Sequence, residues 1–185
     1  NPSTEEVISL MPDGTVEDAR KAIDAAEKAQ NQWERTPSIE RAAYLTKIAA
    51  GIRKREKELT DIIVREGGKT QGLANVEVLF TADYMDYMAG WARRYEGEII
   101  PSDRPHENIF LFKRPIGVTT GILPWNFPFF LVARKAAPAL ITGNTIVIKP
   151  SQLTPENAYV FAQIVEEAGL PAGVFNLVNG RGSVI

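Results

Sequence analysis

Apolar and polar residues follow two different periods along the 185-residue chain. In the first half, apolar side chains recur every three or four positions, which is typical of amphipathic helices. These helices are expected at residues 16–33, 39–63 and 73–95. In the second half, β-branched runs predict strands at 118–123, 145–148 and 174–178, with helices at 129–141 and 154–168 between them. Strands that alternate with helices predict an α/β fold with a parallel sheet.

Capping residues indicate where these helices begin and end. Thr15, followed by two acidic residues in the first turn, is a good N-cap for the first helix. Either Thr36 or Ser38 is expected to cap the second helix, and Gly67-Gly68 to end it. Thr154 is the expected cap of the last helix.

Two features accompany these elements. An aromatic stripe in the third helix is expected to pack against a neighbouring sheet, with stacking on a ligand as the alternative. Short extended segments are expected at 4–11, 98–101 and 109–113. His106 lies in the polar loop before the last of them and is expected to be a solvated residue without a catalytic or metal role. The aromatic stripe of the third helix consists of Val76, Phe80, Tyr84, Tyr87, Met88, Trp91 and Tyr95.

Polar residues at two strand ends are the first sign of chemistry. The run 118–123 leads into Pro124-Trp125-Asn126-Phe127-Pro128, where two prolines end the strand and leave Asn126 on a stiff turn. The run 145–148 ends on Lys149. Because ligands bind at the carboxyl ends of parallel strands, both side chains are expected on the ligand side of the sheet. By residue type alone, Asn126 could instead satisfy backbone groups of its own turn.

Composition excludes several classes of protein. Hydrophobic residues make up 44% and charged residues 24%, as in ordinary globular domains. A net charge of −2 predicts no nucleic-acid partner, and the most apolar window is too polar for a membrane span. The absence of cysteine excludes disulfides and thiolate chemistry within these residues and fits a cytoplasmic protein. No signal peptide is expected from the N-terminal residues.

Three motifs carry a family resemblance. They read GILPWNFP at 121–128, GNTIVIKP at 143–150 and GVFNLV at 173–178. Their order and spacing resemble the aldehyde dehydrogenase superfamily, although the usual G-x-G-x-x-G is missing from the first turn. The Glu66-Gly-Gly-Lys69 stretch resembles the same family, and residues 81–88, 91–100 and 102–105 are most similar to members that oxidise lactaldehyde and glycolaldehyde.

The resemblance implies roles for individual residues. Asn126 matches the amide that donates to the oxyanion formed when a thiolate adds to the aldehyde carbonyl. Lys149 matches a lysine that binds the adenosine ribose of the cofactor. The other residues that match cofactor contacts are Ile122, Leu123, Pro124, Trp125, Ser151, Gln152 and Gly182.

Gln152 departs from the pattern of NAD-preferring members, which have a glutamate that accepts bonds from both ribose hydroxyls. NAD is the expected cofactor, but a neutral Gln152 would not repel the 2′-phosphate of NADP. Lys149 nearby would attract that phosphate. The protein is therefore expected to tolerate NADP better than a relative with glutamate at this position.

The resemblance also implies a domain organisation. Residues 1–97 would form the N-terminal helical part of the cofactor-binding domain, and 98–115 the β-arm through which a dimer or tetramer assembles. Residues 116–185 would form the first βαβαβ part of a Rossmann-like NAD(P)-binding domain. In the family, the catalytic cysteine and general-base glutamate lie further along the chain. These residues are therefore expected to be the N-terminal part of a longer enzyme.

Two functions remain as hypotheses. The first is oxidation of a small aldehyde, such as lactaldehyde or glycolaldehyde, to the carboxylic acid through a cysteine thiohemiacetal and a thioester. The second is a non-catalytic nucleotide-binding or assembly module, if the 185 residues are complete. The absence of cysteine favours the module, whereas an oxyanion donor in the turn at 124–128 favours the enzyme.

Overall fold

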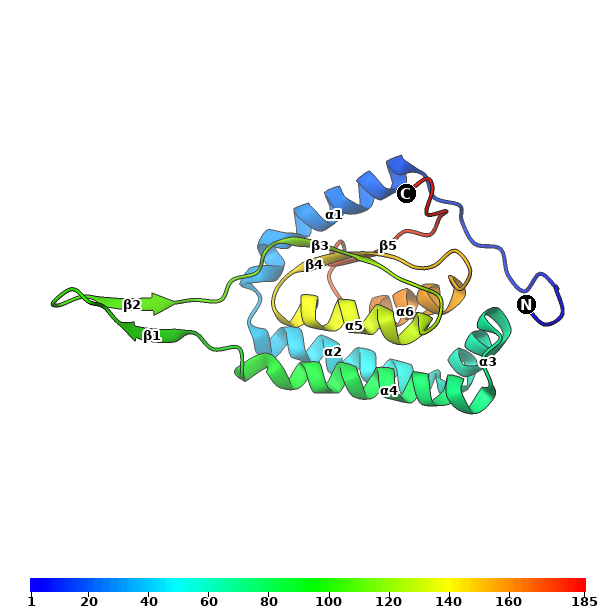
Figure 1. Ribbon diagram of the computed structural model, residues 1–185, viewed down its shortest axis with the longest axis horizontal. Coiled ribbons are helices and arrows are strands. Elements are labelled where there is room, and N and C mark those ends of the chain that lie inside the picture. Colours follow the sequence, from blue (N-terminus) through cyan, green and yellow to red (C-terminus); the bar gives the residue numbers. More distant parts are fainter.

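The computed structural model describes all 185 residues as layers of helix and sheet (Figure 1). Helix α1 covers one face of the sheet, α5 and α6 cover the other, and α2, α3 and α4 form an outer layer. None of these helices is long and apolar enough to cross a membrane. The helices are α1 (Val16–Arg35), α2 (Ser38–Lys54), α3 (Glu56–Gly67), α4 (Gln71–Ala89), η1 (Gly90–Arg93, a 3₁₀ helix), α5 (Pro128–Ile141) and α6 (Glu156–Glu167). The strands are β1 (Glu98–Pro101), β2 (Asn108–Leu111), β3 (Val118–Ile122), β4 (Thr145–Lys149) and β5 (Phe175–Leu177).

Strands β3, β4 and β5 form the predicted parallel sheet, with β4 in the middle. The register puts Ile122, the last residue of β3, beside Lys149, the last residue of β4. All of β4 except Lys149 is buried, whereas β3 and β5 are edge strands and are only partly buried. The strand–helix order from the sequence is confirmed. Full burial is limited to the middle strand, which has a neighbour on each side.

A single core of 29 buried residues connects the outer helices to the sheet. It extends from Trp33 in α1 to Val174 before β5, so it contains residues that precede β1 and β2 in the chain and residues that follow them. Gly121 lets α5 lie directly against β3 in this core. A Cβ at Gly121 would come within 2.7 Å of Ile148 Cδ1 and 3.2 Å of Lys135 Cβ. A larger residue would therefore push α5 off the sheet.

The helix expected at 39–63 is two helices, α2 and α3. They meet at Arg55, whose φ of −103° and ψ of 19° interrupt the helical geometry. The Arg55 guanidinium donates to Glu58 at 2.7 Å and to Gln163 of α6 at 2.9 Å. The prediction of one helix was wrong because the apolar period continues through the bend, and a period does not report the direction of the axis.

Two of the expected caps are confirmed and two are wrong. Gly68, with a φ of 66°, is the C-cap of α3, so the helical segment ends at Gly67-Gly68 as expected. Thr15 and Asp18 form a capping box, in which each side chain accepts from the other residue's backbone N–H. At α2, Pro37 occupies the N-cap position, so neither Thr36 nor Ser38 caps the helix. At α6, the Thr154 hydroxyl is buried without a hydrogen-bond partner. A residue from a distant helix replaces it, as described below.

The aromatic stripe of α4 does not pack against a sheet. Phe80 and Tyr87 are 53% and 57% exposed, and the buried face of α4 instead presents small residues such as Ala74 and Ala82 to the neighbouring helices. At one point the stripe meets α5, where the Phe80 ring lies 4.7 Å from that of Phe130. The prediction was wrong because the layer beside α4 is made of helices α2 and α5, against which the small residues pack.

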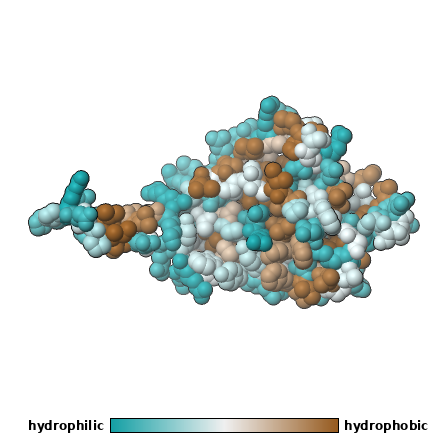
Figure 2. Space-filling model, viewed as in Figure 1, coloured by the Kyte–Doolittle hydropathy of each residue, from teal (hydrophilic) through white to brown (hydrophobic).

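Strands β1 and β2 form an antiparallel hairpin that projects away from the body (Figure 1). Residues 98–101 are a strand as predicted, and the second strand spans 108–111 instead of 109–113. Every residue of both strands is exposed, and Figure 2 shows apolar side chains on the arm behind a hydrophilic tip. Residues 4–11 form no strand, because no strand of the sheet pairs with them.

Candidate functional site

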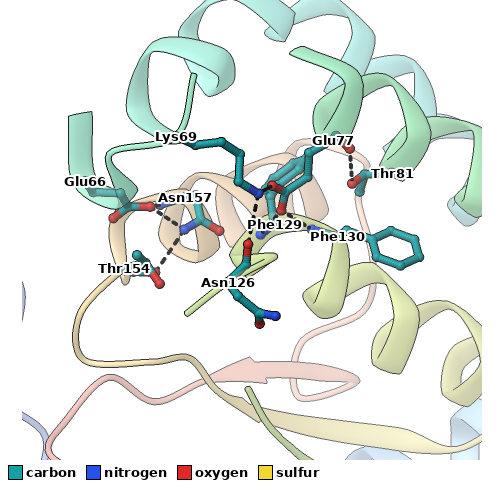
Figure 3. Close-up of polar contacts among 9 residues, drawn as sticks. All are labelled: Glu66, Lys69, Glu77, Thr81, Asn126, Phe129, Phe130, Thr154 and Asn157. Carbon is teal, nitrogen blue, oxygen red and sulfur yellow. Dashed lines mark hydrogen bonds and ion pairs between the residues drawn. The ribbon is translucent and has the colours of Figure 1, made fainter. Parts of the chain in front are cut away.

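Asn126 lies in the turn that joins β3 to α5. Its side chain is exposed and its amide makes no hydrogen bond within the chain. Its backbone carbonyl oxygen accepts a hydrogen bond from Lys69 Nζ at 2.9 Å, and Figure 3 shows the amide pointing away from that contact. The interpretation in which the amide satisfies its own turn therefore fails, and the amide is free to bind a ligand.

A buried ion pair binds this turn (Figure 3). The Glu77 side chain, on the inner face of α4, is fully buried, and that of Lys69 is 16% exposed. Lys69 Nζ lies 2.5 Å from one Glu77 carboxylate oxygen and 4.0 Å from the centre of the Phe127 ring. The other oxygen of Glu77 accepts from the backbone N–H groups of Phe129 at 2.9 Å and Phe130 at 3.1 Å. Glu77 thus caps α5 from a different helix, at the end where a negative charge is favoured.

A second buried glutamate caps α6 in the same way. Glu66, at the end of α3, accepts from the backbone N–H groups of Glu156 at 2.8 Å and Asn157 at 3.1 Å. It also accepts from the side-chain amide of Asn157, which in turn donates to the Thr154 carbonyl at 2.9 Å. Burial raises the pKa of the Glu66 carboxyl above its ordinary value of 4.5, although these hydrogen bonds oppose the shift. Glu66 thereby ties α3 to the loop between β4 and α6.

A groove between α4 and α5 opens beside Asn126. Its volume is about 350 Å³, and most of its lining is apolar. Glu77, Asn126 and Arg134 add polar groups to this lining. The apolar lining residues are Leu73, Val76, Phe80, Phe127, Phe130 and Leu131.

Lys149 and Ile122 lie together at the carboxyl end of the sheet. Lys149 Nζ donates to the carbonyl oxygens of Gly180 at 2.9 Å and Pro150 at 3.2 Å. Since an ammonium group has three protons, one remains available to a ligand. Ile122 is 76% exposed, which is unusual for the end of a sheet strand, and Trp125 beyond it is 58% exposed. We call these two exposed apolar residues at the carboxyl end of β3 the apolar ledge.

The remaining predicted residues lie in the segments that follow β3, β4 and β5. Pro124 is exposed, whereas the Leu123 side chain is buried in the core, so only its backbone can reach a ligand. In the loop after β4, the Ser151 hydroxyl accepts from the Leu153 N–H at 3.2 Å. The Gln152 side-chain oxygen accepts from the Gly182 N–H at 3.3 Å.

A small cavity of about 170 Å³ lies beside Gln152. Arg181 also lines it and forms an ion pair with Asp13 at 3.1 Å across the same space. The cavity is therefore lined by the neutral amide of Gln152 and by both members of the Arg181–Asp13 ion pair.

Comparison with known proteins decides the family. The family model described as "Aldehyde dehydrogenase family" matches residues 1–185. The chain belongs to the aldehyde dehydrogenase family. This confirms the resemblance that was read from the three motifs.

Individual relatives give the same result. Lactaldehyde dehydrogenase of Escherichia coli K12 is 72% identical over all of this chain, which covers 39% of that relative. The D-glyceraldehyde dehydrogenase (NADP(+)) of Thermoplasma acidophilum is 43% identical, again over the whole chain and 38% of the relative. The crystal structure of E. coli lactaldehyde dehydrogenase superimposes with a TM-score of 0.98 at 73% identity, over the whole chain and 39% of that structure. The chain thus spans about 39% of the length of this relative.

The aldehyde dehydrogenase fold brings the predicted residues to one end of the sheet, and their binding roles stay predictions. Sequence reasoning gave no role to Glu66, Lys69 or Glu77. A signal for Glu77 was present, because it follows Ala74 and precedes Val78 on the apolar face of a helix. A charged residue within an apolar stripe indicates a buried partner.

Proposed function

We propose that this chain is part of an enzyme that oxidises a small aldehyde to the carboxylic acid with NAD or NADP as acceptor. The observation that carries the proposal is the unpaired side-chain amide of Asn126, on a turn between the ledge at the strand ends and the groove between α4 and α5. Membership of the aldehyde dehydrogenase family and 72% identity to a lactaldehyde dehydrogenase support the same reaction.

Asn126 stabilises the negative charge that develops on the aldehyde oxygen when a nucleophile adds to the carbonyl carbon. A fixed, neutral N–H donor suits this step, because it requires no reorganisation as the charge forms. Removal of one such donor typically costs about 3–4 kcal/mol of transition-state stabilisation. The chain itself contains no cysteine, so the thiolate of the family reaction comes from outside these residues.

The residues at the strand ends fit a dinucleotide cofactor. Ile122 and Trp125 offer exposed apolar surface to a flat ring, and the free proton of Lys149 can donate to a ribose hydroxyl. Bound NAD or NADP supplies the hydride acceptor, whereas the residues of this chain bind and orient it. Ser151 and Gln152 in the loop after β4, and Gly182 in the segment after β5, contribute the surroundings of the ribose.

Both NAD and NADP are accepted in this proposal. The neutral Gln152 presents no charge against a 2′-phosphate, and Arg181 lies across the same small cavity. An acidic residue at the ribose favours NAD, whereas a nearby arginine accommodates the additional phosphate of NADP. One relative at 43% identity is named as an NADP(+) enzyme, which supports this reading.

The substrate is a small hydroxyaldehyde such as lactaldehyde or glycolaldehyde. The name of the relative at 72% identity supports this class. The groove beside Asn126 supports it as well, because its apolar walls can hold a short carbon chain and Arg134 can donate to a hydroxyl oxygen.

The hairpin β1–β2 is the assembly arm of a homo-oligomer in this proposal, and residues 98–115 form a functional unit apart from the two segments around them. Exposed apolar residues on a projecting two-stranded arm support this role. An isolated hairpin is marginally stable, and its open edges invite a partner.

The proposal is tested in the full-length protein by following NADH or NADPH formation from lactaldehyde. Asn126→Ala should lower kcat by about 100- to 1,000-fold with near-normal cofactor affinity, because it removes one oxyanion donor. Since the amide makes no bond within the chain, the truncation leaves the bonds of the turn intact. Lys47→Met, at an exposed site, is the control and should retain wild-type activity. Cofactor binding without any aldehyde oxidation would favour the non-catalytic module instead.

A further inference from the structure

The buried pair Lys69–Glu77 makes four contacts with the turn that carries Asn126 and with the first residues of α5. Lys69 contacts the Asn126 carbonyl oxygen and the Phe127 ring, and Glu77 contacts the N–H groups of Phe129 and Phe130. We propose that Lys69 and Glu77 are positioning residues that fix the Asn126 amide for catalysis. This inference rests on the proposed function, because the direction of the amide matters to the reaction only if it binds the oxyanion.

The turn has few other restraints. The prolines at 124 and 128 fix their own φ angles, and Pro128 also restricts Phe127 before it, but they leave the torsions of Trp125 and Asn126 free. The hydrogen bond from Lys69 is the one that residues 124–126 make with the rest of the chain. After them, the Phe127 carbonyl already accepts from Leu131 in the first turn of α5. Loss of the Lys69 contact would therefore release the residue whose side chain must point at the substrate.

The burial of the pair indicates that it fixes the backbone geometry of the turn, in addition to any effect on the stability of the fold. The Glu77 side chain is fully buried, and that of Lys69 is 16% exposed. Desolvating two charges costs about as much as their attraction returns, so well-packed apolar residues often stabilise a fold equally well. Apolar residues could fill this space, but they could not bind a carbonyl oxygen on one side and two N–H groups on the other. The pair is chemically matched to the backbone of this turn.

The test removes both charges together, with the double substitution Lys69→Met and Glu77→Gln. Replacing Lys69 alone would leave an unpaired buried carboxylate and could unfold the protein. Glutamine keeps an oxygen that accepts from the N–H groups of Phe129 and Phe130, so α5 retains its cap. The turn loses the hydrogen bond from Lys69 to the Asn126 carbonyl oxygen. Lys47→Met is the matched control, because Lys47 Nζ also lies over a ring, at 5.5 Å from that of Tyr44, and has no carboxylate or carbonyl partner.

Three measurements on the full-length protein report the outcome. The double substitution should lower kcat by about 10- to 100-fold, as expected for a misplaced catalytic group, with the dissociation constant of the cofactor unchanged. Amide hydrogen exchange across residues 124–130 should become faster than in wild type and in the Lys47 variant. In an Asn126→Ala background, the same double substitution should cause no further loss of kcat, because there is no amide left to position.

The outcomes separate this inference from the proposed function. If the losses multiply in the Asn126→Ala background, or if exchange across 124–130 does not change, the pair has only a structural role and the inference is wrong. An unchanged kcat in the folded double variant also overturns it. If Asn126→Ala alone has wild-type kcat, the oxyanion role itself fails. In each case the melting temperature verifies that the variant is folded.

Discussion

At the scale of single residues, Gln152 is the position at which the proposed cofactor preference can be tested. Its side chain faces the Gly182 N–H and the cavity that also holds Arg181. A carboxylate at this position would accept bonds from ribose hydroxyls but would repel a phosphate. The neutral amide does neither strongly, which is why the proposed function includes both cofactors.

Gln152→Glu should therefore shift the preference toward NAD. We expect the ratio of kcat/KM for NAD to that for NADP to rise at least about 10-fold, equivalent to ~1.4 kcal/mol of added repulsion in the NADP complex. Steady-state kinetics with each cofactor measures this ratio. Gln163→Glu introduces the same charge on α6, where its side chain bonds Arg55, and should leave the ratio unchanged. An unaltered ratio in the Gln152 variant would refute the role assigned to this residue.

At the scale of elements, α5 and α6, which begin near the carboxyl end of the sheet, are capped by side chains of other helices. α5 is capped by Glu77 of α4, and α6 by Glu66 of α3. Neither helix has a side-chain cap from its own N-terminal residues. The outer layer thereby fixes where both helices begin, and with them the loops that carry Asn126 and Gln152.

The cap at α6 predicts a pH dependence of stability. Burial raises the pKa of folded Glu66 above 4.5, so below 4.5 the carboxyl is protonated in both the folded and the unfolded chain. As the pH rises through 4.5 toward the folded pKa, only the unfolded chain loses the proton, and stability decreases. The loss is complete above the folded pKa.

Glu66→Gln removes this titration and retains an acceptor for the N–H groups of α6. The melting temperature of wild type should therefore fall relative to that of the variant as the pH rises from about 4 through the folded pKa. Thermal unfolding of both proteins across that range measures the difference. Parallel curves would show that Glu66 does not titrate in this way. Glu58→Gln is a comparison of opposite sign, because the hydrogen bond from Arg55 lowers the pKa of that exposed carboxyl.

At the scale of the whole molecule, the hairpin and the carboxyl end of the parallel sheet are separated. The arm leaves the body where β3 begins, and the predicted binding residues lie where the parallel strands end (Figure 1). Ile99 and Phe110 face each other across the hairpin and are 71% and 58% exposed. In the proposed function, assembly through the arm can therefore occur without covering the carboxyl end of the sheet, where the predicted binding residues lie.

Replacing both Ile99 and Phe110 by serine should reduce the oligomer to smaller species, because it removes apolar surface that a partner would bury. Light scattering after size exclusion, or sedimentation velocity, measures the mass of the full-length protein. Arg104→Ser in the exposed tip of the hairpin is the control and should leave the mass unchanged. If the double variant has the mass of the wild-type oligomer, the arm is not part of the assembly interface.

The sequence by itself determined the parts whose signals are local. Apolar periods predicted the helices and strands, the two prolines predicted the turn around Asn126, and the position of Lys149 at a strand end predicted its side of the sheet. Three motifs identified the family. These signals depend on residues within a few positions of one another, so they are visible without knowledge of the packing.

Tertiary structure alone decided the rest. The bend at Arg55 and the exposure of the α4 stripe depend on which layers meet, and an apolar period is the same on either side of a bend. The α6 cap comes from Glu66, which is 90 residues from Glu156 in the chain, so Thr154 was a false signal. Lys69 reaches Asn126 across 57 residues. A charged residue on an apolar helix face indicates that it has a buried partner, because a buried charge without a partner is costly. The sequence does not indicate which groups are its partners, because that depends on how the helices pack.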